Sequence, residues 1–367
     1  MTLLLTNETV ERLLTMELCM EALEYAQREL GQGQAVLGPV YRVLAPVDPA
    51  RVPADVPGEP VHYSYSSMAA ALPGWDVAAD RKDSDLTCYV NTPSGSRLAR
   101  IPASPGGRFC GLILLYRAST GELLAIIHDG FLQKTRVGGL AGVAAKYLAR
   151  ADASVLAVIG AGWQASAQVE AHCRARPIRE VRVYSPTPER RTAFAAQMSE
   201  RVGCEVRAVD SAREAVRGAH IVATATNAIE PVLAGEWLEE GMFLTSVKDV
   251  EWDRAAYARC DVLTANRRGP TWQRYAVGGA EAIPEHGKEI WYQWTPEQWE
   301  SVRLLGEVIA GRAEGRTRPE QVIGFINEGE GLQFAAVGRR LYDLARERGL
   351  GQELPTEWFL QDSRYIP

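Results

Sequence analysis

The sequence has no apolar run long enough to cross a membrane. Its longest apolar segments fall well short of the roughly 18 residues that a spanning helix requires. The start, MTLLLTNETVERLL, has neither a basic region nor a small-residue cleavage site, so no secretory signal peptide is predicted. We therefore expect a cytoplasmic protein without a membrane partner.

The sequence also lacks an excess of positive charge, and it lacks the usual residue spacings of metal sites. The formal net charge of -6 argues against a partner that offers a phosphate backbone, so nucleic acid is not expected. The five histidines show no His-x-x-x-His spacing, and no metal site is predicted. The six cysteines are scattered without Cys-x-x-Cys, which indicates reduced thiols. The absence of Gly-x-Ser-x-Gly and of a Walker loop removes the simplest hydrolase and nucleotide-triphosphatase functions.

What the sequence does contain is a strand, a glycine turn and a helix between Ser154 and Glu170. The apolar run 155–159 is typical of a parallel strand that is buried on both faces. The turn fits Gly-x-Gly-x-x-Gly/Ala, in which glycines allow a tight bend and the approach of a pyrophosphate to the helix N-terminus. We predict dinucleotide binding, against the alternative of α/β packing without a phosphate. The residues of the turn are Gly160, Ala161, Gly162, Trp163, Gln164 and Ala165.

Further strand-like runs follow at α/β spacing, with helix-like segments between the earlier ones. This pattern predicts an α/β fold with a Rossmann-type, doubly wound parallel sheet over residues 151–319. Residues 1–150, completed by 320–367, are expected to form a second, α+β domain for substrate binding and dimerisation. In this interpretation the strand QVIGFI and the last helix return to the first domain. The runs are 179–185, 204–209, 219–226, 242–247 and 260–266.

The first domain carries an apolar hairpin and a dense charge cluster. Residues 108–116 and 123–130 are expected to pair around a turn at Gly121. These strands are too apolar to leave uncovered, which predicts a homodimer built through this domain. The charges at 80–85 are typical of a solvated turn.

Arg136 stands at the head of a helix rich in glycine and alanine, FLQKTRVGGLAGVAAKYLAR. An anionic substrate group there could meet both a guanidinium fork and free backbone N–H groups. The alternative is a surface arginine paired with Asp129. The residues alone leave both alternatives open.

Four segments give the chain a family resemblance over nearly its whole length. They are VIGAGWQASAQ, TRVGGLAGVAAKYLAR, ATATNAIEPVL and LLGEVIAGRAEGRTRPEQVIGFINEGEGLQFAAV. Together they resemble the ornithine cyclodeaminase/mu-crystallin family of NAD(P)-dependent oxidoreductases. The resemblance implies hydride transfer between nicotinamide and the α-carbon of an amino acid or its imine, in an imine reductase or amino-acid dehydrogenase. Alternatives are an ornithine cyclodeaminase-type lyase with tightly held NAD and a non-catalytic, small-ligand-binding dimer of the mu-crystallin type.

The resemblance also implies a set of basic residues on the substrate side. Arg136 matches the arginine that holds the substrate carboxylate, and Arg42 matches a second basic position. The family's lysine falls here in AADRKDSD, at Arg81 or Lys82. A guanidinium at that position would bind a carboxylate but would be a poor proton donor, because arginine stays charged.

The resemblance places the family's catalytic aspartate nearest to Asp249, after the fifth strand of the sheet. A carboxylate at the carboxyl end of a parallel strand would face the cleft where the nicotinamide lies. Lys248 and Glu251 stand beside it, and either could take over the acid/base role. The alternative is that Asp249 caps the helix beginning near Trp252.

We expect NADP(H) to be preferred over NAD(H). The second strand ends in VRVYS, with Ser185 where an NAD enzyme would place an acidic residue for the ribose hydroxyls. Hydroxyls and guanidinium groups follow, which suit a 2′-phosphate, although the arginines could also be solvated helix residues. The expected cofactor contacts outside the glycine turn are Ser185, Thr187, Arg190, Arg191, Thr224, Thr226, Asn227 and Val247.

Overall fold

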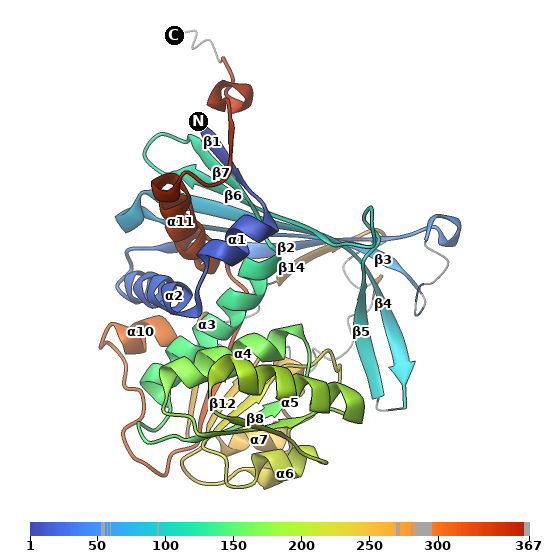
Figure 1. Ribbon diagram of the computed structural model, residues 1–367, viewed down its shortest axis with the longest axis vertical. Coiled ribbons are helices and arrows are strands. Elements are labelled where there is room, and N and C mark those ends of the chain that lie inside the picture. Colours follow the sequence, from blue (N-terminus) through green and yellow to red (C-terminus); the bar gives the residue numbers. More distant parts are fainter. Residues whose placement is uncertain are drawn as a thin grey trace.

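Two β-sheets organise the molecule, with the mixed sheet in the upper half of Figure 1 and the parallel sheet in the lower half. The structure is a computed structural model that describes residues 1–52, 56, 58, 60–93, 95–268, 272–279, 282–283 and 296–362. No helix within those ranges is long and apolar enough to cross a bilayer. The predicted α/β class, with a Rossmann-type sheet beside a second domain, is confirmed.

The parallel sheet has the strand order β10-β9-β8-β11-β12-β16-β13-β15. Its order reverses between β8 and β11, and such a switch point opens a crevice beyond the carboxyl ends of the strands. Its strands are β8 (Val155–Ile159), β9 (Glu180–Tyr184), β10 (Glu205–Ala208), β11 (Ile221–Thr224), β12 (Phe243–Ser246), β13 (Val262–Ala265), β15 (Arg303–Leu304) and β16 (Ile323–Ile326). Helices of this part of the chain are α4 (Trp163–Ala175), α5 (Pro188–Val202), α6 (Ala212–Val216), α7 (Arg254–Arg259), α9 (Pro296–Ser301) and α10 (Leu305–Ile309).

One strand of the parallel sheet comes from near the end of the chain. β16 lies between β12 and β13 and pairs in parallel with both. The expectation that this strand returns to the first domain is therefore wrong, and the chain leaves the parallel sheet only after Ile326. All four residues of β16 are buried, as an interior strand with helices on both faces requires.

The mixed sheet has the order β14-β2-β3-β4-β6-β7-β1-β17, with β5 paired to β4. The predicted hairpin is confirmed as the antiparallel pair β6 and β7. The strands are β1 (Thr2–Leu5), β2 (Val36–Pro46), β3 (His62–Leu72), β4 (Val77–Thr92), β5 (Gly95–Ile101), β6 (Cys110–Arg117), β7 (Leu123–His128), β14 (Trp272–Ala276) and β17 (Gln352–Leu354). Four helices accompany it: α1 (Asn7–Leu13), α2 (Met16–Gly31), α3 (Gly130–Leu148) and α11 (Gly331–Arg348). Short 3-10 turns are η1 (Pro49–Arg51), η2 (Pro73–Trp75), η3 (Gly235–Trp237), η4 (Asp249–Glu251) and η5 (Thr356–Phe359).

β4 runs straight through the charge cluster at 80–85, so the predicted solvated turn is wrong. Alternate side chains of a strand point to opposite faces, and Arg81, Asp83 and Asp85 point to the buried face. Arg81 lies 3.0 Å from Asp83 and 2.6 Å from Asp129, counted between guanidinium nitrogen and carboxylate oxygen. These mutual partners allow the charges to be buried.

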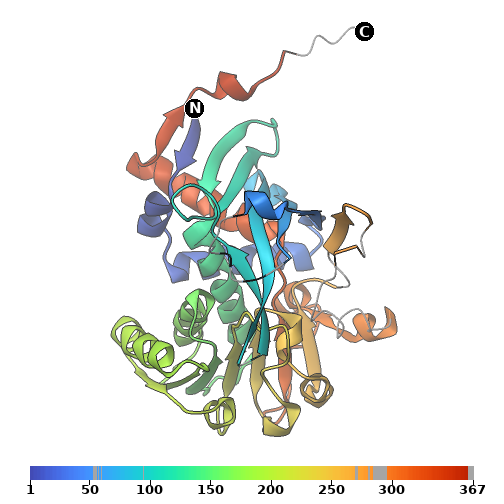
Figure 2. The same cartoon turned by 90° about the vertical axis from the view of Figure 1, so that its right-hand side faces the viewer.

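The β4–β5 hairpin and helix α3 connect the two sheets. The strands β4 and β5 run from the mixed sheet down to the parallel-sheet unit (Figures 1 and 2). Near the end of this hairpin, Leu98 N donates to Asn227 O and Ile229 N donates to Ser96 O, both at 3.3 Å. Helix α3 packs against both α2 and α4. The segment following β11 is thus fixed by the mixed-sheet domain.

Candidate active site

The glycine turn has the geometry that a pyrophosphate needs. Gly160 has φ +118°, and a Cβ there would lie 2.2 Å from Ala225 O, so only glycine fits. A Cβ on Gly162 would meet nothing within 4 Å. Gly162 is also the N-cap of α4 and, because it has no side chain, it leaves the first N–H groups of the helix uncapped. Open space therefore lies at the start of a long helix, where free N–H groups attract an anion.

The residues expected at the adenosine end divide into two groups. Arg191 is engaged by the protein, since it donates to Ser185 O at 3.0 Å and pairs with Asp210 at 2.5 Å. Arg190 and Thr187 are exposed, and Ser185 is half-buried. Thr187 is the N-cap of α5 and makes no side-chain cap bond. Arg190 is thus the arginine here that can meet a 2′-phosphate without first losing an ion pair.

Glu251 organises the ends of β11 and β12. This fully buried carboxylate accepts five hydrogen bonds of 2.6 to 3.1 Å. Burial raises the pKa of Glu251, while the hydrogen bonds from Thr226 lower it. Both oxygens are occupied by donors from the protein, so Glu251 holds together the segments that follow β11 and β12. Its donors are Thr224 Oγ1, the backbone N and Oγ1 of Thr226, Val247 N and Lys248 N.

Asp249 and Lys248 lie just beyond β12, both half-buried. Asp249 Oδ1 accepts from Val250 N at 2.9 Å, and Lys248 Nζ donates to Ala228 O at 3.2 Å. The alternative that Asp249 caps the next helix is wrong. Asp253 does so instead, because its side chain accepts from Ala256 N at 2.7 Å at the start of α7.

Arg136 is a buried cation held by amides. Its Nε and Nη2 donate to Gln133 Oε1 at 3.1 and 2.7 Å, and its Nη1 donates to Gln333 Oε1 at 2.5 Å. Burial lowers its pKa to about 10. Within the described part of the chain no carboxylate forms an ion pair with Arg136, whereas Asp129 pairs with Arg81. The alternative of a surface arginine bound to Asp129 is therefore wrong, and a substrate carboxylate is a fitting counter-ion.

The other basic candidates separate onto the two faces of the mixed sheet. The guanidinium carbons of Arg81 and Arg136 lie 5.7 and 4.9 Å from the centre of the Phe334 ring, so these two arginines share a site. Lys82 points to the opposite face, where it pairs with Asp80. Arg42 is in register with Ser66, whose hydroxyl accepts from Arg81 at 3.4 Å. The structure thus brings Arg42, Arg81 and Arg136 to one side and leaves Lys82 out.

The sequence model of the ornithine cyclodeaminase/mu-crystallin family matches residues 106–349. The chain belongs to this family. An uncharacterized cyclodeaminase of Sinorhizobium fredii is 35% identical over 247 residues, which cover 66% of this chain and 72% of that protein.

Two solved structures extend the likeness to almost the whole chain. A Delta(1)-pyrroline-2-carboxylate reductase of Thermococcus litoralis, in complex with NADH and L-proline, has a TM-score of 0.73 at 28% identity, covering 96% of this chain and 100% of that one. An archaeal alanine dehydrogenase dimer with bound NAD has a TM-score of 0.74 at 25% identity, covering 96% and 99%. The predicted family is confirmed.

In this member of the ornithine cyclodeaminase/mu-crystallin family a buried glutamate lies close to the arginines, and sequence reasoning missed it. Glu330 precedes α11 and accepts from Gln27 Nε2 at 2.5 Å and from Asn266 Nδ2 at 2.7 Å. Burial raises its pKa to about 7. The polar run after QVIGFI was the available signal, because residues just beyond a parallel strand line the crevice.

Glu330→Gln is expected to stabilise the protein increasingly as the pH rises. The folded-state pKa of about 7 lies above the ordinary 4.5, so the stability contributed by Glu330 is full below about pH 4.5 and is lost as the pH rises through 7. The glutamine variant does not titrate, so above pH 7 its free energy of unfolding should exceed that of the wild type by up to about 3 kcal/mol. Thermal unfolding of wild type and variant between pH 5 and 8 measures this difference, and Glu328→Gln is the control. Parallel curves for wild type and Glu330→Gln would contradict the expectation.

Proposed function

We propose that this family member is an NAD(P)-dependent oxidoreductase that transfers a hydride between nicotinamide and the α-carbon of an amino acid or imino acid. It would act as an imine reductase or an amino-acid dehydrogenase. The main support is the buried Arg136, which has no carboxylate partner in the described ranges and shares its site with Arg81. The open helix start at Gly162 and the names of the two solved relatives support it further.

Each part of the site has a role in this proposal. The first N–H groups of α4 hold the pyrophosphate, and Arg136, with Arg42 and Arg81, holds the substrate carboxylate. Asp249 exchanges a proton with the substrate nitrogen. When bound, the nicotinamide supplies or accepts the hydride. Fixing the substrate at its carboxylate keeps the α-carbon in reach of that hydride.

The absorbance of NAD(P)H tests the function directly. The purified protein is mixed with cyclic imines, or with 2-oxo acids plus amines, and oxidation of the reduced cofactor is followed. Consumption that depends on the imine supports the proposal. A protein that binds these compounds without consuming cofactor would instead be a non-catalytic small-ligand-binding dimer.

An ornithine cyclodeaminase-type activity is the second candidate, because the relative from Sinorhizobium fredii carries a cyclodeaminase name. That reaction returns the hydride to the same substrate, so ammonia would be released from ornithine without net change in NAD. Arg81 at the position of the family's lysine weighs against it, since a guanidinium does not donate protons readily.

NADPH is expected to bind more tightly than NADH. No acidic side chain directly follows β9, while the exposed Arg190 offers a partner to the 2′-phosphate. Arg190→Ala should weaken NADPH binding about tenfold or more and leave NADH binding unchanged. Fluorescence titration measures both constants, with Arg201→Ala at the far end of α5 as control. Both solved relatives hold NAD(H). A lower dissociation constant for NADH than for NADPH would overturn the expected preference.

A homodimer is expected through the outer face of the mixed sheet. The apolar side chains of the predicted hairpin are mostly not available to a partner, because Ile113, Leu115 and Ile127 are already buried within the subunit. Light scattering should give twice the chain mass, and a mass near 40.2 kDa at micromolar concentration would contradict it. A Tyr41→Glu, Val43→Glu variant should be monomeric, because buried charge opposes association. Exposed apolar side chains on this face are Val36, Tyr41, Val43, Leu112 and Tyr275.

A further inference from the structure

Arg267 has two guanidinium nitrogens that find no acceptor among the described residues. It lies two residues beyond the end of β13, and its Nε and Nη1 are buried without a hydrogen-bond partner in the part of the chain that the structure describes. Burial lowers its pKa. Buried donors are almost always satisfied in folded proteins, because a donor left open has lost its hydrogen bond to water without a replacement. An acceptor from outside the chain is therefore the natural partner of this side chain.

The position of Arg267 is the carboxyl edge of the parallel sheet, on the side facing Glu330. β13 pairs with β16, and Glu330 follows β16 as the N-cap residue of α11. Arg267 and Arg136 both act electrostatically on the Glu330 carboxyl. Neither is bonded to it, because the Glu330 oxygens take the amides of Gln27 and Asn266. Two guanidinium groups thus act on one carboxyl without binding it. Arg136 donates to neutral amides, whereas Arg267 keeps two buried nitrogens for a ligand.

The neighbouring arginine differs in this respect. Arg268 Nε donates to Val302 O at 3.0 Å, and its Nη2 pairs with Glu307 at 3.3 Å. Arg268 is exposed, whereas Arg267 is half-buried. Burial and the missing acceptor at Arg267 are therefore not general features of this strand end.

We propose that Arg267 is a second anion-binding residue of the substrate site, and that the substrate is an amino or imino acid with a further carboxylate on its side chain. The inference rests on the proposed function, in which Arg136 holds the α-carboxylate. A guanidinium fork matches a carboxylate in two parallel hydrogen bonds. Two cations at the two ends of one substrate fix its orientation. A substrate with a neutral side chain would leave the buried donors of Arg267 without an acceptor. The site would therefore discriminate against that substrate.

Isosteric substrate pairs test the proposal. Initial rates of cofactor reduction are measured with L-glutamate against L-glutamine and with L-aspartate against L-asparagine. In the wild type, kcat/KM for the acid should exceed that for its amide by about 10- to 150-fold, the effect of one charged hydrogen bond. Arg267→Gln should bring this ratio close to one, mainly through KM of the acid. Arg268→Gln should keep the wild-type ratio.

Two results overturn the proposal: equal use of acid and amide by the wild type, or an unchanged ratio in Arg267→Gln. Arg267→Lys keeps the charge without the fork and should give an intermediate ratio, which guards against a variant that fails to fold. If no amino acid or imine is turned over, the proposed function fails. Calorimetry with glutarate against butyrate on the wild type then decides the inference separately, and equal binding of the two would overturn it.

Discussion

Arg136→Ala is expected to lower kcat/KM by about thirtyfold to several thousandfold while NADP(H) binding stays near that of the wild type. Arg136 is 4% exposed, and within the described ranges its guanidinium donates hydrogen bonds only to the amides of Gln133 and Gln333. Removing the cationic partner of a desolvated substrate carboxylate costs about 2–5 kcal/mol. The effect should appear largely in KM, because the guanidinium acts in both ground and transition states.

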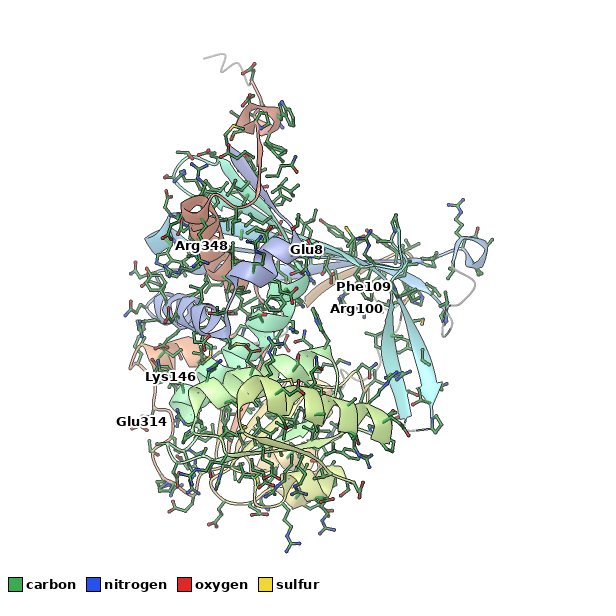
Figure 3. All side chains as sticks on the ribbon, viewed as in Figure 1. Glu8, Arg100, Phe109, Lys146, Glu314 and Arg348 are labelled. Atoms are coloured by element: carbon green, nitrogen blue, oxygen red, sulfur yellow. The ribbon has the colours of Figure 1, made fainter. Side chains whose placement is uncertain are left out.

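The measurement combines steady-state kinetics with a fluorescence titration of NADPH. Lys146→Ala is the control, since Lys146 belongs to the same helix α3 but lies on the outside, paired with Glu24 (Figure 3). Arg136→Lys keeps the charge and should recover part of the activity. A wild-type KM in Arg136→Ala would remove Arg136 from the substrate site.

Asp249→Asn is expected to lower kcat by about a hundredfold to ten-thousandfold, with little change in stability. Asparagine keeps the volume and an oxygen that can accept from Val250 N, but it cannot titrate. Positioned proton transfer contributes about that factor to a rate. The fold does not need Asp249 as a cap, because Asp253 caps α7.

Asp253→Asn is the matched control for this prediction. Asparagine caps a helix about as well as aspartate, so that variant should keep both its activity and its stability. Wild-type turnover of Asp249→Asn across the pH range would move the proton-carrying role to Lys248. Glu251 would not be the next candidate, since its oxygens already accept five hydrogen bonds.

The parallel sheet was predictable because its strongest signals are local. The run 155–159 and the glycine turn after it lie within a few residues of each other. β16 escaped prediction because its four residues carry no periodicity that separates a central strand of one sheet from a strand of the other. Only pairing with β12 and β13, far away in the sequence, decides its place.

The candidate site was predictable only where its residues lie in locally recognisable segments. Arg136 could be found from the small-residue helix that it heads and from the family resemblance. The charges at 80–85 were misjudged because Arg81 finds its partner Asp129 across 48 positions of the chain. Glu330 and Arg267 depend on two strand ends that meet only in the folded sheet. Composition cannot distinguish such a buried, partnered charge from a solvated one.

The place of β16 also governs how this protein can be made. β13 and β15 are joined to the rest of the parallel sheet through β16, so a nascent chain cannot complete that sheet until residue 326 has left the ribosome. Until then the edges of β12 and β13 lack their shared neighbour, and unpaired edges invite aggregation. Helix α11 follows at once and packs on β3 and β4 of the mixed sheet. The half of the molecule that contains the parallel sheet therefore cannot be transplanted as a separate unit. A fragment that stops at 319 would keep the glycine turn and lose the strand that joins β13 to β12.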